Sequence, residues 1–586
     1  MCGIFAYQGN KSNTAQLILE GLRSLEYRGY DSWGVAAKQS DGAVYIKKKV
    51  GKIGDAQVPI ISSLTGIGHT RWATHGGVTE TNAHPHTDCT VKIIVVHNGI
   101  IENFQELKSN LLKKGHTFKS ETDTEVLAHM VEDEYKPKKK LIDIVDSVYK
   151  KLKGMNAFIV FYAPTEEIVA VKDGSPIVFT QTENEVVLAS DLTALIPYSN
   201  NVYFMEDGEM LSIHKKKATL FTTGGNKKRI RYTKLSVTTK DLGLGTHKHF
   251  MMKEIYEQPA VLENMINSQK EIIKEMAAAI ANAYGTYLVG CGTAYYACLA
   301  GTYLFSKIAK RHINASIGSE FTYLEDFLKK TSLVIALSQS GETIDIISSI
   351  KKAKMKKAKI MAITNVLGSS LYRLADYKAL LQAGPEKCVL ATKSFTAKIA
   401  MLYLLAHQLD NSYDFGTSQI KKVIQEITTL LKNKNKIKLI AQGLLNKEHI
   451  FILGRGVSYA TAVESALKIK EVSYIHAEGF AAGELKHGVI ALIEPGTPVI
   501  IFNPEDETYD DTLSAAYEVK ARGAYIIGIS NKKNDIYDEF IHVNNCKDAT
   551  IIPNVIVAQL IGYYLAIAKG YDPDKPRNLA KSVVVK

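Results

Sequence analysis

The first residue of the chain with a reactive side chain is Cys2, which directly follows Met1. If Met1 is removed, which the small side chain of Cys2 permits, Cys2 carries a thiol and a free α-amino group. A free α-amine has a pKa of about 7.7–8.0, so part of it is unprotonated near neutral pH. It can then accept the thiol proton, and the thiolate is the nucleophilic form. A small buried residue opening a strand is the ordinary alternative for Cys2.

Five polar clusters could supply the other groups that a site around this thiol requires. They are residues 27–32, 69–76, 82–86, 97–103 and 120–125. Each has an ordinary explanation when taken alone. Asn98-Gly99 is typical of a hairpin turn, and Asp123 is a suitable helix cap. His84 and His86 without a third ligand are weak support for a metal.

The segments that must position these clusters are mostly short and strand-like. Apolar or alternating runs occupy residues 2–7, 66–73, 91–97, 157–162, 168–172 and 185–189, and helical periodicity occupies 14–25 and 124–133. Strands with few helices between them predict antiparallel sheets packed with helices. A loss of periodicity with several glycines over residues 205–250 predicts a domain boundary near residue 240. The segment after it, 249–259, reads as a helix ended by Pro259.

Together, Cys2 and the five clusters resemble the glutaminase domain of class II (N-terminal-nucleophile) glutamine amidotransferases, over roughly residues 2–240. The resemblance implies an α+β domain of the Ntn-hydrolase type, an αββα sandwich. It implies that Cys2 attacks the glutamine side-chain amide and forms a γ-glutamyl thioester. The Asn98 side chain and the Gly99 N–H would stabilise the oxyanion, and losing one such donor typically costs ~3–4 kcal/mol.

The same resemblance implies how glutamine is held. Arg71 would bind the α-carboxylate and Asp123 the α-ammonium, a charge pairing that recognises a free amino acid. Trp72 is either a gate beside Arg71 or a core aromatic residue. Arg28 would support the nucleophile, and the remaining pocket residues would be Thr74, His75 and His86.

The last 340 residues contain an internal repeat. Three strand-like runs, each leading into helical sequence, recur at nearly constant spacing, which indicates two copies of a parallel α/β unit. The matching pairs, at offsets of 164, 165 and 166 residues, are Gly290 and Gly454, Thr343 and Thr508, and Asn365 and Asn531.

The two copies differ in their polar turns. Residues 338–343, Ser-Gln-Ser-Gly-Glu-Thr, offer hydroxyls and backbone N–H groups to an anion at a helix N-terminus. The second copy has Asn503, Glu505 and Asp506 there, and their carboxylates would repel phosphate. The sequence therefore predicts that only the first copy binds a phosphate, with a simple capping motif as the alternative.

The second copy carries reactive side chains instead. Lys468 and Glu471 are three residues apart and share one helix face, which a surface ion pair would also explain. His487 follows in a glycine-flanked segment. Lys581 lies in a tail that is apolar enough to predict docking rather than fraying.

With these motifs the whole chain resembles the isomerising glutamine–fructose-6-phosphate aminotransferase family, which has tandem SIS (sugar isomerase) domains. The resemblance implies two α/β domains with doubly wound parallel sheets. It also implies transfer of the glutamine amide nitrogen to fructose 6-phosphate and isomerisation to glucosamine 6-phosphate, with release of glutamate. This is the first step of hexosamine synthesis, and no cofactor or metal is expected. The expected ranges are 1–240 (glutaminase), 241–425 (linker and first SIS domain), 426–572 (second SIS domain) and 573–586 (a tail over the isomerase site).

The resemblance also assigns roles in the sugar chemistry. His487 would open the sugar ring, and Glu471 would move the proton between C1 and C2. Lys581 would form the Schiff base with the C2 carbonyl, with Lys468 as a competing candidate. The sugar phosphate would be held by Thr293, Ser338, Gln339, Ser340 and Thr343.

Composition limits the location and partners of the chain. The content of 46% hydrophobic and 23% charged residues is that of an ordinary globular protein. The net charge is +12, but the basic runs are scattered and lack aromatic interleaving, so nucleic acid binding is not expected. Six cysteines without a CxxC pair argue against a disulfide framework and a zinc site. The apolar stretch 551–568 contains Pro553 and predicts a strand or loop before a buried helix rather than a membrane span. We expect a cytoplasmic protein without a membrane partner and, from the family resemblance, a homodimer.

Two other functions remain open. Another class II amidotransferase, acting on phosphoribosyl pyrophosphate or aspartate, is disfavoured because no pyrophosphate- or ATP-binding loop is found. A sugar-phosphate-sensing regulator without catalysis is disfavoured by the retained Cys2 and Lys581. Ala294 and Ala391 stand where serine is common in the family, which predicts altered affinity rather than lost function.

Overall fold

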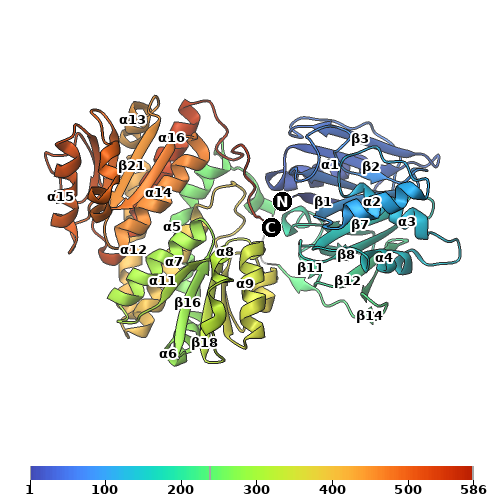
Figure 1. The fold of residues 1–586 in the computed structure, drawn as a ribbon, viewed down its shortest axis with the longest axis horizontal. Helices are drawn as coiled ribbons and strands as arrows, with labels where there is room; N and C mark the ends of the chain where they lie inside the picture. Colours follow the sequence, from blue (N-terminus) through green and yellow to red (C-terminus); the bar gives the residue numbers. More distant parts are fainter. Residues whose placement is uncertain (1, 236–238, 584–586) are drawn as a thin grey trace. The chain divides into compact units, whose positions relative to one another are not determined.

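The computed structural model of the chain describes residues 2–235 and 239–583, which form two compact units (Figure 1). The N-terminal unit extends from the start of the chain to Gly243 and includes residues 580–583 of the tail. The C-terminal unit comprises Leu244–Leu579.

The N-terminal unit contains two antiparallel sheets. The eight-stranded sheet has the order β15-β11-β9-β10-β1-β4-β2-β3, and the seven-stranded sheet has the order β14-β13-β12-β8-β7-β6-β5. The first contains β1 (Gly3–Gly9), β2 (Ser32–Lys38), β3 (Val44–Val50), β4 (Thr65–Arg71), β9 (Val178–Gln181), β10 (Glu185–Ala189), β11 (Asn201–Phe204) and β15 (Thr233–Lys234). The second contains β5 (His86–Thr87), β6 (Ile93–Gly99), β7 (Asn156–Tyr162), β8 (Glu167–Lys172), β12 (Glu209–His214), β13 (Lys217–Thr222) and β14 (Lys227–Lys228).

Helices cover both sheets and complete an αββα sandwich. Helix α1 (Thr14–Leu25) packs on β1 and β4, while α3 (Glu125–Glu134) and α4 (Leu141–Tyr149) pack on the second sheet and α2 (Phe104–Lys113) packs on α3. Both faces of the first sheet need to be covered, because the side chains of strand β1 alternate between two apolar surfaces. Ile4 and Ala6 join the core between the sheets, whereas Phe5 lies against Gly21 of α1. The predicted fold class is confirmed for this unit.

The C-terminal unit contains two five-stranded parallel sheets with matching topology. Their orders are β17-β16-β18-β19-β20 and β22-β21-β23-β24-β25, so each strand has a counterpart in the other copy. The first sheet contains β16 (Gly285–Gly290), β17 (Asn314–Ile317), β18 (Ser332–Ser338), β19 (Lys359–Thr364) and β20 (Tyr377–Leu380). The second contains β21 (His449–Gly454), β22 (His476–Ala481), β23 (Pro498–Phe502), β24 (Tyr525–Ser530) and β25 (Glu539–His542). The predicted pair of parallel α/β copies is confirmed.

The repeat extends to the turns that start the first helix of each copy. A Cβ on Gly290 would lie 2.6 Å from the Ala294 carbonyl carbon, and one on Gly454 would lie 2.1 Å from the Ser458 carbonyl oxygen. Both strands therefore end close to the first turn of the helix that follows, α7 (Thr293–Lys307) in the first copy and α14 (Val457–Ser473) in the second. This close approach brings the N-terminus of each helix to the edge where the strands end.

One continuous apolar core joins the two copies, with helices α5 to α16 around the sheets (Figure 1). The other helices are α5 (Phe250–Ser268), α6 (Lys270–Asn282), α8 (Gly318–Phe321), α9 (Ile344–Met355), α10 (Ser370–Leu374), α11 (Lys393–Leu409), α12 (Tyr413–Lys432), α13 (Asn435–Gly443), α15 (Tyr509–Lys520) and α16 (Ile551–Ala568). Helix α16 packs against α14 and α13, and almost all of its side chains are buried. A Cβ on Gly562 of α16 would lie 3.3 Å from the Lys468 carbonyl oxygen, so glycine allows α16 to pack closely on α14.

Two helices differ from their predicted form at proline. Helix α5 continues through Pro259 instead of ending there, because its buried stripe includes Ile255 and Leu262 on either side of the proline. This packing offsets the backbone hydrogen bond that proline removes. Residues 551–568 form one helix rather than a strand or loop before a helix, since Pro553 lies in the first turn, where its missing N–H costs nothing.

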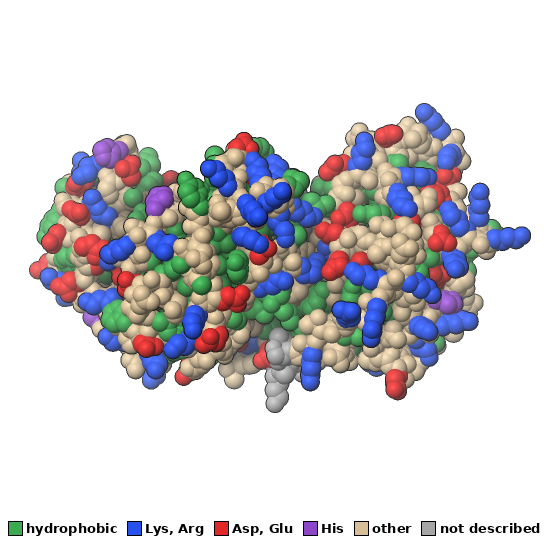
Figure 2. Space-filling view, turned by 90° about the horizontal axis from the view of Figure 1, so that it is seen from below, with side chains coloured by type: hydrophobic (Ala, Val, Ile, Leu, Met, Phe, Trp, Pro, Cys, Tyr) green, Lys and Arg blue, Asp and Glu red, His purple; other side chains and the backbone are tan. Residues whose placement is uncertain are grey.

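Within the described residues, a single helical segment, Lys547–Ala568, has the length and apolarity to cross a membrane. Of its most apolar window, 83% is buried inside the protein, so this segment is a core helix. On the face shown in Figure 2, the Lys and Arg side chains are interspersed with acidic ones. The positive charge is therefore distributed over this face.

Candidate functional site

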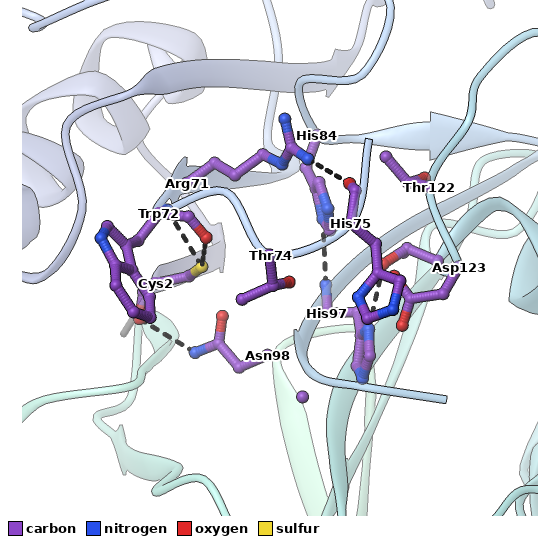
Figure 3. A pocket seen from close by; sticks show the side chains of 12 residues that line it. Cys2, Arg71, Trp72, Thr74, His75, His84, His97, Asn98, Thr122 and Asp123 are labelled. Carbon is purple, nitrogen blue, oxygen red and sulfur yellow. Dashed lines mark hydrogen bonds between the residues drawn. The ribbon is translucent and has the colours of Figure 1, made fainter. Parts of the chain in front are cut away.

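A pocket that is open to solvent lies in the N-terminal unit where several strands end (Figure 3). Cys2 immediately precedes β1, and the antiparallel pairing of β1 with β4 places it beside Arg71 at the end of β4. Asn98 comes from the end of β6 in the other sheet. The pocket is lined by Cys2, Arg71, Trp72, Thr74, His75, His84, His97, Asn98, Gly99, Thr122, Asp123 and Thr124.

The Cys2 thiol is held at the pocket wall by the backbone of Trp72. The Trp72 N–H donates to Cys2 Sγ over 3.2 Å. Burial raises the pKa of the Cys2 thiol, and the hydrogen bond from Trp72 acts in the opposite direction. Trp72 itself is only partly buried and lines the pocket, so it is not a core aromatic residue.

The side-chain amide of Asn98 is fixed in one orientation. Its Nδ2 donates to the Cys2 carbonyl oxygen over 3.0 Å. Its Oδ1 lies 3.0 Å from His69 Nε2, which is also 3.0 Å from the carbonyl oxygen of His97. Both neighbours of Nε2 are oxygens that only accept, so Nε2 holds the proton and donates. The Asn98 amide N–H groups are therefore directed towards Cys2.

Glycine is required at position 99. Its φ is 146°, and a Cβ there would lie 2.3 Å from the Met155 carbonyl oxygen. The backbone of Asn98-Gly99 consequently takes a conformation that other residues would strain. This residue ends β6 at the pocket, so the sequence Asn-Gly is a feature of the site and not a two-residue hairpin turn.

Two buried residues of opposite charge line the same pocket. The Arg71 guanidinium donates to the carbonyl oxygens of His75, Gly76 and Gly77, and it thereby holds the loop that follows β4. Asp123 Oδ2 accepts the N–H of Ile101 over 2.8 Å. A cation and an anion in one pocket are the complement of a zwitterionic ligand.

Four buried histidines near the pocket are neutral. Burial lowers the pKa of four neighbouring imidazoles below the usual value, those of His69, His84, His86 and His97. The pKa of His69 falls to about 3, and His84 stacks on it with ring centroids 4.1 Å apart. His86, expected in the pocket wall, lies behind it and is 3.0 Å from Thr122 Oγ1.

Arg28 is a supporting residue. Its guanidinium pairs with Asp191 over 2.9 Å and contacts the Cys2 carbonyl oxygen over 3.4 Å. A Cβ on the neighbouring Gly29 would lie 2.8 Å from the Trp72 nitrogen. Arg28 and Gly29 therefore fix the backbone on both sides of the thiol.

In the C-terminal unit, the serine-rich turn 338–343 joins β18 to α9. Ser338 Oγ accepts the Gly341 N–H over 2.9 Å and lies 3.4 Å from Thr343 Oγ1. Gly341 has a φ of 67°, and a Cβ there would lie 2.1 Å from Ser369 Oγ. The turn is therefore tight, and it gathers its hydroxyls at the N-terminus of α9. Gln339 and Ser340 are half-buried in the same turn.

A buried charge cluster connects the two SIS-like copies through Lys468 of α14. Its Nζ lies 2.7 Å from Glu471 Oε2 and 3.6 Å from Glu464 Oε1. It also donates to Thr293 Oγ1 over 3.0 Å, and Thr293 begins α7 of the first copy. The sequence did not predict Glu464, although its spacing of four residues from Lys468 on one helix was an available signal.

The charges in this cluster depend on one another. Burial alone would lower the pKa of Lys468, but the carboxylates of Glu471 and Glu464 raise it above its usual value. Burial raises the pKa of Glu464 to about 7, although Lys468 acts against it. Lys468 is therefore a protonated ammonium at neutral pH.

Two predicted residues lie outside these clusters. His487 is exposed at the end of the short 3-10 helix Ala482–His487. Lys581 is half-buried in the tail segment that groups with the N-terminal unit. Their catalytic roles stay predictions.

Comparisons with known proteins cover the whole chain. Residues 48–222 match the glutamine amidotransferase domain family, and residues 279–408 and 443–569 each match the SIS domain family. Proteins named glutamine–fructose-6-phosphate aminotransferase (isomerizing) are 41% identical in Thermococcus kodakarensis and 42% identical in Pyrococcus horikoshii. Both comparisons span 100% of this chain and of the relative. The solved C-terminal domain of glucosamine-fructose-6-phosphate aminotransferase from Francisella tularensis is 34% identical with a TM-score of 0.52, covering 57% of this chain and 99% of that one.

Proposed function

Since the chain belongs to the glutamine–fructose-6-phosphate aminotransferase (isomerizing) family, we propose that it takes the amide nitrogen of glutamine at the Cys2 pocket and installs it on fructose 6-phosphate at the Lys468 cluster. The product is glucosamine 6-phosphate, and glutamate is released. The observation that supports the first half most strongly is the convergence of Cys2, the oriented Asn98 amide and the Arg71–Asp123 pair in one pocket. The proposed domain ranges are those expected from the sequence.

Glutamine binds with its α-carboxylate towards Arg71 and its α-ammonium towards Asp123. The Cys2 thiolate attacks the side-chain amide carbon, and the N–H groups of Asn98 and Gly99 stabilise the oxyanion. Collapse of this intermediate expels ammonia, which takes its proton from the α-amine that removal of Met1 exposes. Water then hydrolyses the thioester and returns the thiol. The raised pKa of Cys2 agrees with the need for a base beside the thiol.

The sugar phosphate binds at the turn between β18 and α9, where hydroxyl groups and a helix N-terminus can hold an anion. Thr293 links the first copy to the charge cluster, because its hydroxyl group accepts a hydrogen bond from Lys468. A Schiff base requires an unprotonated amine, whereas Lys468 is held as an ammonium by two carboxylates. We therefore assign the Schiff base to Lys581, proton transfer between C1 and C2 to Glu471, and ring opening to His487.

From the family we infer a homodimer, in which the exposed His487 serves the partner subunit's site. We also place the protein in the cytoplasm, where both substrates are available. Light scattering of the purified chain would test the dimer.

The decisive experiment incubates the purified full chain with glutamine and fructose 6-phosphate and measures glucosamine 6-phosphate and glutamate. Equal amounts of both products are expected. If fructose 6-phosphate binds but no amino sugar forms, the protein is a sugar-phosphate-binding regulator and the proposal is wrong. A glutamine analogue that alkylates thiols, followed by intact mass, would report removal of Met1 and reaction of Cys2 together.

A further inference from the structure

A second cluster of reactive side chains lies in the N-terminal unit, outside the residues that line the Cys2 pocket. It consists of Cys89, His116, His129 and Glu132, whose potential ligand atoms all lie within 4.8 Å of one another. Nothing in the proposed reaction uses these four residues. We propose that they bind one zinc ion, and this proposal does not depend on the proposed function.

The ligand atoms have the separations that a tetrahedral site requires. Cys89 Sγ lies 3.6 Å from His129 Nδ1 and 3.9 Å from His116 Nδ1. Glu132 Oε2 lies 3.0 Å from His116 Nδ1 and 3.1 Å from His129 Nδ1. Zinc bonds of about 2.0–2.3 Å place ligand atoms roughly 3.3–3.6 Å apart in a tetrahedron. Small movements of the side chains would therefore complete the site.

Both imidazoles also have a carboxylate near the nitrogen that faces away from the cluster, the kind of group that commonly orients a metal-bound histidine. His129 Nε2 points to Glu125 Oε1 at 3.7 Å, and His116 Nε2 lies 3.9 Å from Asp133 Oδ1. A carboxylate on the far nitrogen keeps the proton there and leaves Nδ1 free to bind metal. His129 Nε2 is buried, and its separation of 3.7 Å from Glu125 Oε1 is longer than a hydrogen bond.

The chemistry of the four ligands selects the ion. One thiolate, two imidazoles and one carboxylate suit Zn²⁺, whereas Mg²⁺ and Ca²⁺ prefer oxygen ligands only. Cys89 is exposed, so an ion can enter from solvent. Four protein ligands would fill the coordination sphere, which is typical of a structural site rather than a catalytic one.

The position of the cluster indicates what the ion would stabilise. Cys89 lies between β5 and β6, His116 follows α2, and His129 and Glu132 lie on α3. Zinc would therefore connect three segments that are separate along the chain. Helix α3 begins directly after Asp123 and Thr124, so the ion would also hold the segment that supplies the glutamine pocket.

Without an ion, the same residues form a hydrogen-bonded group centred on Glu132 Oε2. That oxygen accepts the Cys89 N–H over 3.2 Å and lies within hydrogen-bond distance of both imidazoles. Metal content and spectroscopy distinguish this arrangement from a zinc site, because a protein-only group retains no ion.

The test uses the full chain, purified without an affinity tag that binds metal. Elemental analysis should find about one zinc per chain after dialysis. The Cys89→Ser and His129→Gln variants should each retain less than about one tenth of the zinc of the wild type. Asp133→Asn should weaken zinc binding about tenfold. His214→Gln, an exposed histidine at the end of β12 in the same unit, is the matched control and should keep its zinc.

Two further measurements remain valid if a variant folds poorly. Cobalt(II) added to the metal-free wild-type chain should give the visible bands of a tetrahedral site and a thiolate-to-cobalt absorption that Cys89→Ser lacks. Zinc added to the metal-free chain should raise its melting temperature. The proposal is wrong if the wild-type chain holds no zinc, if Cys89→Ser holds as much as the wild type, or if zinc leaves the melting temperature unchanged.

Discussion

Around Cys2, four buried histidines are neutral, and among the described residues that line the pocket the charged side chains are Arg71 and Asp123. Around Lys468, an ammonium and the Glu464 carboxyl group are fully buried beside the partly exposed Glu471, and Lys468 and Glu464 shift each other's pKa. The first arrangement suits a ligand that brings its own two charges and a reaction that starts from one thiol. The second suits proton transfers on a neutral sugar carbon skeleton, where the protein must supply the charges itself.

The difference also lies in how each region is assembled. The Cys2 pocket is built from strand ends and loops within one sandwich, and neutral imidazoles support the Asn98 amide. The Lys468 cluster is built across two helices, α7 and α14, from the two repeated copies. A substitution in one region should therefore abolish the partial reaction of that region and leave the other partial reaction intact.

The largest effect is expected from Cys2→Ala. Glutamine hydrolysis should be abolished, because removing a nucleophile typically costs several orders of magnitude in kcat. Isomerisation of the sugar phosphate should persist, since the Lys468 cluster is untouched. Glutamate release and sugar isomerisation are measured on the same preparation, and a loss of both would contradict the separation of the two regions.

Lys581→Ala should remove the sugar adduct that borohydride traps on the wild-type chain. Peptide mapping of the trapped adduct identifies the lysine directly. Glutamine hydrolysis should be retained, because Cys2 is unchanged. A persisting adduct on Lys468 would transfer the Schiff base to that residue and show that its ammonium can lose its proton.

Lys468→Met should destabilise the C-terminal unit by about 3–5 kcal/mol, because the fully buried Glu464 and the partly exposed Glu471 lose the cation that pairs with both. The double variant Lys468→Met with Glu464→Gln is the matched control, and it should recover part of the loss. Hydrogen exchange of α14 locates the effect. Equal stability of the single and double variants would show that Glu464 is already uncharged once Lys468 is removed.

Asn98→Ala should lower kcat for glutamine hydrolysis by about 10²–10³, the usual cost of one oxyanion donor. The KM for glutamine should change little, since Asn98 contacts Cys2 and not the charged ends of the ligand. Steady-state glutaminase kinetics check both numbers. A rise in KM with unchanged kcat would place Asn98 in binding.

The two regions should respond to pH in opposite directions. The pKa of His69 is about 3 in the folded protein and about 6.5 when unfolded, so its contribution to stability is full above pH 6.5 and is lost as pH falls. At pH 5 the free energy of unfolding should be about 2 kcal/mol lower because of His69 alone. Glu464 acts conversely: its pKa of about 7 exceeds the unfolded value, so stability is lost as pH rises from about 4.5 to 7.

Tryptophan fluorescence can isolate the N-terminal half of this comparison. The chain has two tryptophans, Trp33 and Trp72, and both belong to the N-terminal unit. The fluorescence melting temperature should fall between pH 7 and pH 5. A constant value over this range would contradict the assignment of neutral buried histidines.

The sequence predicted best those elements whose pattern is local. Helix α1 and strand β10 were predicted with their observed ends, because the periodicity is regular and polar or turn residues flank both. Helix α4 was missed because its apolar residues follow the basic run 136–140, which reads as a solvated surface. Helix α5 was cut short because tertiary packing outweighs the local effect of proline.

The candidate sites show the same limit. Cys2, Arg71, Asn98 and Asp123 lie in recognisable clusters, so a family resemblance could bring them together before the structure did. The contact of Thr293 with Glu464 joins residues 171 positions apart, and no spacing in a single sequence encodes it. A zinc site was not expected from the sequence, because Cys89, His116 and His129 form no short metal-binding motif and meet only in the folded sandwich.

The almost complete burial of α16 has a consequence for how the protein is made. It is the last helix among the described residues, and its side chains belong to the core that joins both parallel sheets. A ribosome must therefore translate residues 551–568 before the second copy can enclose its apolar surface. Until then the nascent chain exposes the apolar surface of α14 that α16 covers. A shortage of chaperones or premature termination would therefore affect this half of the protein more than the sandwich that emerges first.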